Sequence, residues 1–215
     1  MISFSKVLSF CLLMAGMACV FGAEEAEREL TSAEFISIVR NPPGRECWAK
    51  MDGKATHKRD GSKTVSAPVH LGILFTPKRT VAQVKFKNEI YNIGQSYGNP
   101  PTSTTESILE DDKPQIGVFG IRPEDLTMGF IYWPVKVENE KESALGQSCR
   151  VFTMVSPAKD ETAKVYISEE YFFPLKVEWS KLSADGKSAE APFRTLEITS
   201  FKKEKDFWLV NSLGI

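Results

Sequence analysis

The chain has 215 residues, 27 basic and 28 acidic, and a formal net charge of -1. This near balance excludes the strong basic excess with which nucleic-acid-binding proteins neutralise phosphates, so we expect no nucleic-acid partner. With 42% hydrophobic and 26% charged residues, the chain is long enough for one globular domain with a substantial core.

The first 23 residues have the pattern of an export signal. Lys6 gives a positive start, an apolar run follows over residues 7–20, and the small residues Gly22 and Ala23 precede an acidic stretch. The apolar run is too short to span a bilayer. We therefore expect a signal peptide over 1–23 and a mature, exported domain over 24–215. Its net charge would be near -2, because Lys6 is the only charged side chain in the leader.

The cysteines leave two questions open. Cys19 follows Gly16-Met17-Ala18, which is loosely similar to a lipoprotein signal, so the chain is either cleaved as an ordinary exported protein or tethered to a membrane through Cys19. Cys47 and Cys149 remain after cleavage. In an oxidising compartment they form one disulfide or stay as two buried free thiols.

The start of the mature chain predicts one helix. Thr31-Ser32-Ala33-Glu34 has the form of a capping box, and Phe35, Ile36 and Val39 share one helical face. Asn41-Pro42-Pro43-Gly44 ends the helix. The apolar face must lie on another part of the protein.

Strand patterns follow over 47–51, 66–76 and 81–91, and the composition then changes. Val69, Leu71, Ile73 and Phe75 alternate with other residues, as in a half-buried strand. Residues 94–105 contain Gly, Pro, Ser and Thr in succession, which is typical of an exposed loop. Strands at this spacing favour an antiparallel sheet or partial barrel.

The segment over 116–133 is apolar and irregular. A glycine-broken run over 116–121 precedes Pro123-Glu124-Asp125, which opens a predicted short helix that is apolar nearly all round. Such a helix must be buried by the sheet, by a partner or by a ligand.

The second half predicts a row of antiparallel strands, beginning at 135–137 and including 163–168, 174–180, 193–199 and 207–210. Leu175, Val177 and Trp179 face one way and alternate with polar residues. Asp185-Gly186 supplies a turn signal between two of these strands.

The order of motifs from residue 120 onward is distinctive. Asp125-Leu126-Thr127 and Tyr132-Trp133-Pro134 are followed by Gly146-Gln147-Ser148-Cys149-Arg150-Val151, a Lys-Val-Tyr-Ile strand, Phe173-Pro174-Leu175-Lys176-Val177-Glu178 and a closing Phe207-Trp208-Leu209. This succession resembles the LolA/LolB-like family of bacterial outer-membrane lipoprotein-sorting proteins. Before residue 120, only the order of a helix and then strands matches.

The resemblance implies a mainly β (α+β) fold, a curved incomplete antiparallel β-barrel with helices covering the concave face. It implies that lipid or an acylated lipoprotein binds between the sheet and a helical lid, in the periplasm of a Gram-negative bacterium. The family's lid contacts do not transfer to particular residues here, and a shared fold does not determine the cargo. The alternative is a structural or interaction protein of the cell envelope that has a packed core and a protein partner.

The candidate ligand-binding residues are apolar. The lid candidates are Leu126, Met128, Phe130, Ile131 and Trp133. The candidates on the sheet side are Trp48, Phe75, Phe86, Trp179 and Trp208. The alternative for each of them is an ordinary core position, which is the commoner role of such apolar and aromatic residues.

No motif supports catalysis. His57 and His70 lack a metal-ligand spacing, and Ser32, Ser148 and Ser168 lack a nucleophile setting. The acidic run over 110–112 lacks the alternating oxygen ligands of a calcium loop. We therefore expect a non-enzymatic monomer without metal or cofactor.

Overall fold

The computed structural model describes residues 2–8, 28–40, 47–58, 64–97, 102–109, 115–183, 185–187, 191–204 and 207–215. For 2–8, 47, 58, 202–204 and 207–209, only the backbone is described. Within these ranges the chain forms one α-helix, three 3-10 helices and twelve strands. No helix among the described residues is both long and apolar enough to cross a membrane.

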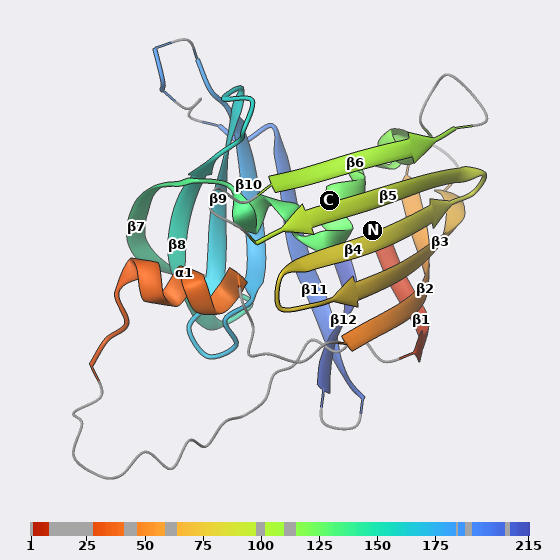
Figure 1. Cartoon of the computed structure of the whole chain (residues 1–215), viewed down its shortest axis with the longest axis horizontal. Coiled ribbons are helices and arrows are strands. Elements are labelled where there is room, and N and C mark those ends of the chain that lie inside the picture. The colour runs from red at the N-terminus through yellow and green to blue at the C-terminus, as the bar shows by residue number, and fades with distance from the viewer. Residues whose placement is uncertain are drawn as a thin grey trace.

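The strands form one antiparallel ladder in the order β6-β5-β4-β3-β2-β1-β12-β11-β10-β9-β8-β7. The strands are β1 (Ile2–Leu8), β2 (Cys47–Lys58), β3 (Thr64–Phe75), β4 (Arg79–Phe86), β5 (Glu89–Ser96), β6 (Thr102–Ile108), β7 (Val135–Ala144), β8 (Gln147–Val155), β9 (Glu161–Ser168), β10 (Pro174–Lys181), β11 (Arg194–Glu204) and β12 (Phe207–Gly214). The sheet curves strongly, so that β7–β10 and β3–β6 run in different directions in Figure 1. No described pairing joins β6 to β7, and the sheet does not close into a barrel.

Strand β1 joins two halves of the ladder. Its register with β12 contains two residue pairs, Ile2↔Leu213 and Ser3↔Ser212, and its register with β2 shifts between Phe4 and Val7. Without β1, the remaining strands would form two sheets, β2–β6 and β7–β12. The first strand therefore lies at the seam of the fold.

The core lies on the inner face of this curved sheet. Strands β3, β4 and β5 alternate between buried and more exposed positions, because successive side chains of a strand point to opposite faces. The predicted inner face of β10 is confirmed, since Leu175, Val177 and Trp179 are all buried. The other buried side chains of the inner face include Val69, Leu71, Ile73, Val84, Phe86, Phe152, Val165 and Ile198.

Two predictions for the first half were wrong. The pattern over 81–91 belongs to two strands, because β4 and β5 form a hairpin that turns at Lys87, which has φ 53°. The predicted loop over 94–105 includes the end of β5 and the start of β6. All seven residues of β6 are exposed, which is why a Ser/Thr run can form an edge strand without apolar alternation.

The apolar 116–133 segment forms three 3-10 helices where the sequence predicted one short helix after Pro123. They are η1 (Ile116–Phe119), η2 (Pro123–Thr127) and η3 (Gly129–Tyr132). Gly120 has φ 74° at the end of η1, and Met128 has φ 54° between η2 and η3. These left-handed residues interrupt the helical backbone, so no continuous helix forms.

The predicted N-terminal helix is confirmed as α1 (Ser32–Arg40). The capping box is formed, with the Thr31 backbone N–H donating to Glu34 Oε2 at 2.9 Å and the Glu34 N–H donating to Thr31 Oγ1 at 3.3 Å. Phe35 packs on β8, where its ring stacks on Phe152 with centroids 5.8 Å apart. The apolar face of the helix is thereby buried, as its pattern requires.

The capping box makes the stability of the protein pH-dependent. Hydrogen bonds from Arg28 and from Thr31 lower the pKa of Glu34 to about 2. A lowered pKa stabilises the fold above the ordinary glutamate pKa, and this contribution is lost as pH falls toward 2. Between pH 4.5 and 2, we therefore expect wild type to lose more stability than Glu34→Gln.

Thermal unfolding at several pH values tests this prediction. Glu140→Gln, on an exposed position of β7, is the matched control and should follow wild type. Parallel pH profiles for wild type and Glu34→Gln would contradict the prediction.

Candidate functional site

The 116–133 segment is the candidate site because it is an apolar element that lies between strands of the two halves of the ladder. In Figure 1 its short helices lie between β4–β6 and β10–β12. Phe130 is 3% exposed, and its ring meets Trp179 of β10 edge to face, with centroids 5.5 Å apart. Phe119 meets Phe86 of β4 in the same manner at 5.1 Å.

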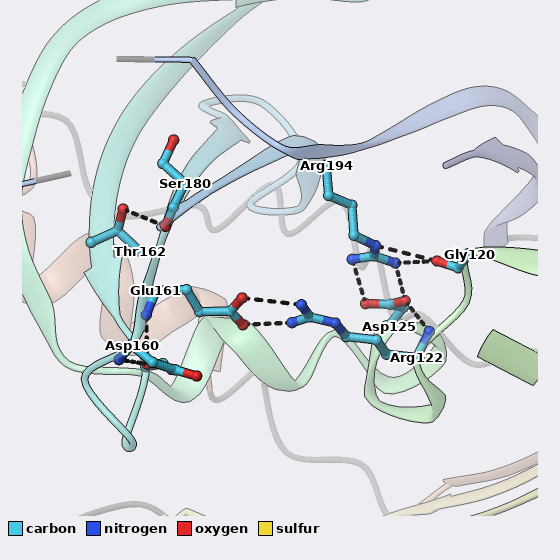
Figure 2. A network of polar contacts seen from close by, with 9 residues as sticks. Gly120, Arg122, Asp125, Asp160, Glu161, Thr162, Ser180 and Arg194 are labelled. Carbon is cyan, nitrogen blue, oxygen red and sulfur yellow. Dashed lines mark hydrogen bonds and ion pairs between the residues drawn. The ribbon is translucent and has the colours of Figure 1, made fainter. Parts of the chain in front are cut away.

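A buried ion pair attaches the segment to β11. Asp125 in η2 is 2% exposed, and both of its carboxylate oxygens accept from the guanidinium of Arg194, one of them at 3.1 Å. Arg194 also donates to the carbonyl oxygen of Gly120 at 3.0 and 3.2 Å (Figure 2). Burial raises the pKa of Asp125, and the charge of Arg194 opposes that rise.

A second ion pair attaches the same segment to β9. The guanidinium of Arg122 donates to both oxygens of Glu161, at 2.5 and 3.0 Å (Figure 2). The hydrogen bond to Glu161 raises the pKa of Arg122. The backbone N–H of Arg122 donates to Asp125 at 2.7 Å, so the two ion pairs meet at one turn of chain.

The two arginines also enclose one aromatic side chain. Trp179 is 1% exposed, and the guanidinium carbons of Arg194 and Arg122 lie 4.3 and 6.0 Å from its ring centroid. This is the range of cation–π contacts. We call Arg122, Asp125, Glu161 and Arg194 the ionic clasp, and Trp179 lies beneath it.

Further hydrogen bonds, outside the ion pairs, hold the rest of the segment. Arg40 of α1 donates to the carbonyl oxygens of Ile131 at 2.8 Å and Trp133 at 2.7 Å. Gln95 of β5 donates to Thr127 at 3.0 Å. The segment is therefore tied by polar contacts to a helix and to strands of both halves of the ladder.

Most predicted ligand-binding residues gather around the segment. In the lid, Leu126, Phe130 and Ile131 are buried, and Met128 and Trp133 are half-buried against the same core. On the sheet side, Phe86 and Trp179 are buried inner-face residues, and Phe75 is half-buried on the inner face. This clustering makes one apolar interior, whether or not it accepts a ligand.

Trp48 does not belong to this interior, so its prediction was wrong. It lies on the outer face of β2 and is 62% exposed, while its neighbour Ala49 points inward. The side chain of Trp208 lies outside the described residues.

The two cysteines are not bridged in the structure. Cys149 carries a free, buried thiol, which supports the free-thiol alternative for this residue over the disulfide with Cys47. The side chain of Cys47 lies outside the described part of the chain. Burial raises the pKa of the Cys149 thiol, which makes it a weak nucleophile.

The two histidines have separate neighbours in the structure. His70 contacts Asp52 through Nδ1 at 2.6 Å, and the ring of His57 lies 6.1 Å from that of Phe119. Among the described residues, no group of three His, Cys, Asp or Glu side chains is placed to hold a metal ion.

Sequence reasoning missed the ionic clasp. Arg122 and Glu161 are 39 positions apart, and Asp125 and Arg194 are 69 apart. The one local signal was Asp125 at the third position of a Pro-initiated helical turn, where a carboxylate can accept from a free backbone N–H. That signal predicts a cap and does not identify an arginine partner.

Comparison with known proteins places the fold and does not identify a family. No protein-family model matches the chain, and no curated protein matches it. Among solved structures, the chain is similar to a DUF1329 family protein from Desulfovibrio piger, with TM-score 0.55, 10% identity, and coverage of 83% of this chain and 81% of that one. This likeness shows a shared fold.

A LolA superfamily protein from Nitrosomonas europaea also matches, with TM-score 0.47 and 10% identity over 82% of this chain and 81% of that one. At this TM-score the match carries no further argument.

Proposed function

We propose that the protein binds or carries lipid or an acylated lipoprotein beneath the 116–133 segment. The observation that carries the proposal is an apolar segment of short 3-10 helices held over an aromatic inner face by polar contacts. In this proposal the segment and α1 act as the helical cover of the concave face. The sequence resemblance of the chain to lipoprotein-sorting proteins also supports lipid or an acylated lipoprotein as the ligand.

The proposed mechanism is exchange of the segment's own apolar contacts for those of an acyl chain. Opening would separate the ionic clasp and expose Phe130 and Trp179. Burying an acyl chain of about 14 methylenes would contribute roughly 11 kcal/mol, at about 0.8 kcal/mol per methylene. Because the separated charges regain water, breaking the buried Asp125–Arg194 pair costs less than about 3–5 kcal/mol. The Arg122–Glu161 pair adds less, because the Arg122 side chain is partly exposed. Ligand binding can therefore offset opening.

The proposed location is the periplasm, after removal of residues 1–23. Cleavage would also remove β1 from the seam between β2 and β12. The short register of β1 with β12 is consistent with a strand that the mature fold does not require. Tethering through Cys19 is the alternative form of export. We propose no enzymatic activity for either form.

Native mass spectrometry of protein purified without detergent, followed by solvent extraction, tests the ligand. The expected result is a stoichiometric acyl lipid or lipopeptide. Protein that carries no extractable lipid and does not bind fluorescent fatty acids would overturn the proposal.

Polar substitution at Met128 should weaken fatty-acid binding. Met128 is half-buried against the core, whereas Val118, in the same segment, is 52% exposed. Loss of one apolar contact predicts about tenfold weaker binding for Met128→Asp. Val118→Asp is the matched control and should bind as wild type. Equal affinities for wild type and a folded Met128→Asp variant would exclude the segment from the binding site.

A second function, an envelope interaction protein, is favoured by the packing of the same interior. Leu126, Phe130 and Trp179 are buried against other side chains of the core. In this alternative the interior remains solid and the edges of the ladder bind a protein. The absence of extracted lipid, together with isolation of a stable protein complex, would favour the envelope interaction protein over the lipid carrier.

A further inference from the structure

The outer face of β2–β4 carries a continuous apolar row. Trp48 lies opposite Leu74, and Leu74 lies opposite Val81, in the registers of β2 with β3 and of β3 with β4. Side chains opposite each other on one face are near neighbours. Their exposed fractions are 62%, 42% and 39%. Three adjoining exposed apolar residues differ from the scattered ones that any surface contains.

Basic side chains lie next to this row and farther along the same strands. The exposed basic residues of the same face and its β3–β4 turn are Lys50, Lys54, Lys78, Arg79 and Lys85. The acidic side chains on the described part of this face are Asp52, which is paired with His70 at 2.6 Å, and Glu106, which lies opposite Asn92 on the edge strand β6. In a chain with net charge -1, this is a strong local positive asymmetry. We call the row and its five basic neighbours the outer patch.

We propose that the outer patch docks the protein on the surface of an anionic phospholipid bilayer. Trp is favoured at the level of lipid headgroups, where its ring is partly apolar and its N–H stays wet. Lys50 and Arg79 lie on opposite sides of the apolar row and would contact headgroup phosphates. The patch repels a second copy of itself, because both faces would be basic.

This docking surface is independent of the proposed interior ligand. The outer patch and the 116–133 segment lie on opposite faces of the sheet, since Trp48 points outward and Ala49 inward. Docking would hold the protein at a membrane while its interior remains covered. Loss of interior lipid binding would therefore leave the docking proposal intact.

Vesicle co-sedimentation of the protein purified after export tests the proposal. One vesicle is phosphatidylcholine alone, and the other contains phosphatidylglycerol at about 30%. We expect binding to the anionic vesicle, weakening as salt rises from about 20 to about 500 mM, because salt screens exposed charges. The fluorescence of wild type, compared with that of Trp48→Phe, should show a blue shift of Trp48 on binding.

Surface variants locate the contact. Lys50→Gln and Arg79→Gln should each weaken binding to anionic vesicles about fivefold. Trp48→Ser should weaken it about tenfold. The matched controls, Lys136→Gln and Val137→Ser on the exposed part of β7, should bind as wild type. All five substitutions are at exposed positions, so the core is preserved.

Two results would overturn the proposal. One is wild-type binding by the Trp48, Lys50 and Arg79 variants, which would place membrane contact elsewhere. The other is failure of the wild-type protein to sediment with anionic vesicles at low salt. In that second case, the partner whose charge complements the outer patch would be an acidic protein surface.

Discussion

Replacing Arg194 by leucine is expected to lower the free energy of unfolding by about 3–5 kcal/mol, because Asp125 is then buried without its cation. Asp125 is 2% exposed, and Arg194 contacts both of its carboxylate oxygens. The substitution also removes the donors to the Gly120 carbonyl and the guanidinium over Trp179. Urea unfolding followed by circular dichroism measures the loss.

The double variant Asp125→Leu/Arg194→Leu separates the buried charge from the lost packing. If the unpaired carboxylate causes most of the loss, the double variant should be more stable than Arg194→Leu alone. Arg79→Leu, at an exposed arginine of β4, is the matched control and should change stability by less than about 0.5 kcal/mol. A loss below about 1 kcal/mol for Arg194→Leu would show that the clasp is solvated in solution.

Local patterns predicted the elements whose structure depends on near neighbours in the chain. The α1 capping box joins Thr31 and Glu34, which are three positions apart, so the sequence contains both partners. Leu175, Val177 and Trp179 alternate because β10 has one buried face. Such periods of three to four and of two residues are visible without a tertiary structure.

Elements without such local signals were missed. The β4–β5 turn at Lys87-Asn88 has neither Gly nor Pro, so Asn88 alone marked the end of one strand and the start of the next. Strand β6 is an exposed edge and needs no apolar alternation. The ionic clasp depends on residues brought together from η2, β9 and β11, which only the fold determines.

The orientation of Trp48 was predictable from its neighbours. Lys50, Asp52 and Lys54 share its face of β2, whereas the small residues Ala49 and Ala55 occupy the inner face. The size of its side chain favoured an inward Trp48. Period-two alternation, however, required Trp48 to point the same way as Lys50, Asp52 and Lys54. The rule of alternation was stronger because β3 packs in register along the whole of β2.

Truncating Trp179 to alanine is expected to cost about 3–5 kcal/mol of unfolding free energy, because it empties the largest fully buried side-chain position of the core. The ring contacts Phe130 at 5.5 Å and lies beneath both arginines of the ionic clasp. Its indole N–H is buried and has no hydrogen-bond partner among the described residues.

Trp179→Phe should cost far less, about 1–2 kcal/mol, because it keeps an aromatic ring and removes the unpaired N–H, whose burial is itself unfavourable. Urea unfolding of both variants beside wild type tests this order. Equal losses for the phenylalanine and alanine variants would mean that the N–H finds a partner that Phe cannot replace. A loss below about 1 kcal/mol for Trp179→Ala would show that the inner face is loosely packed under the 116–133 segment. Loose packing is expected of an open ligand cavity and not of a solid core.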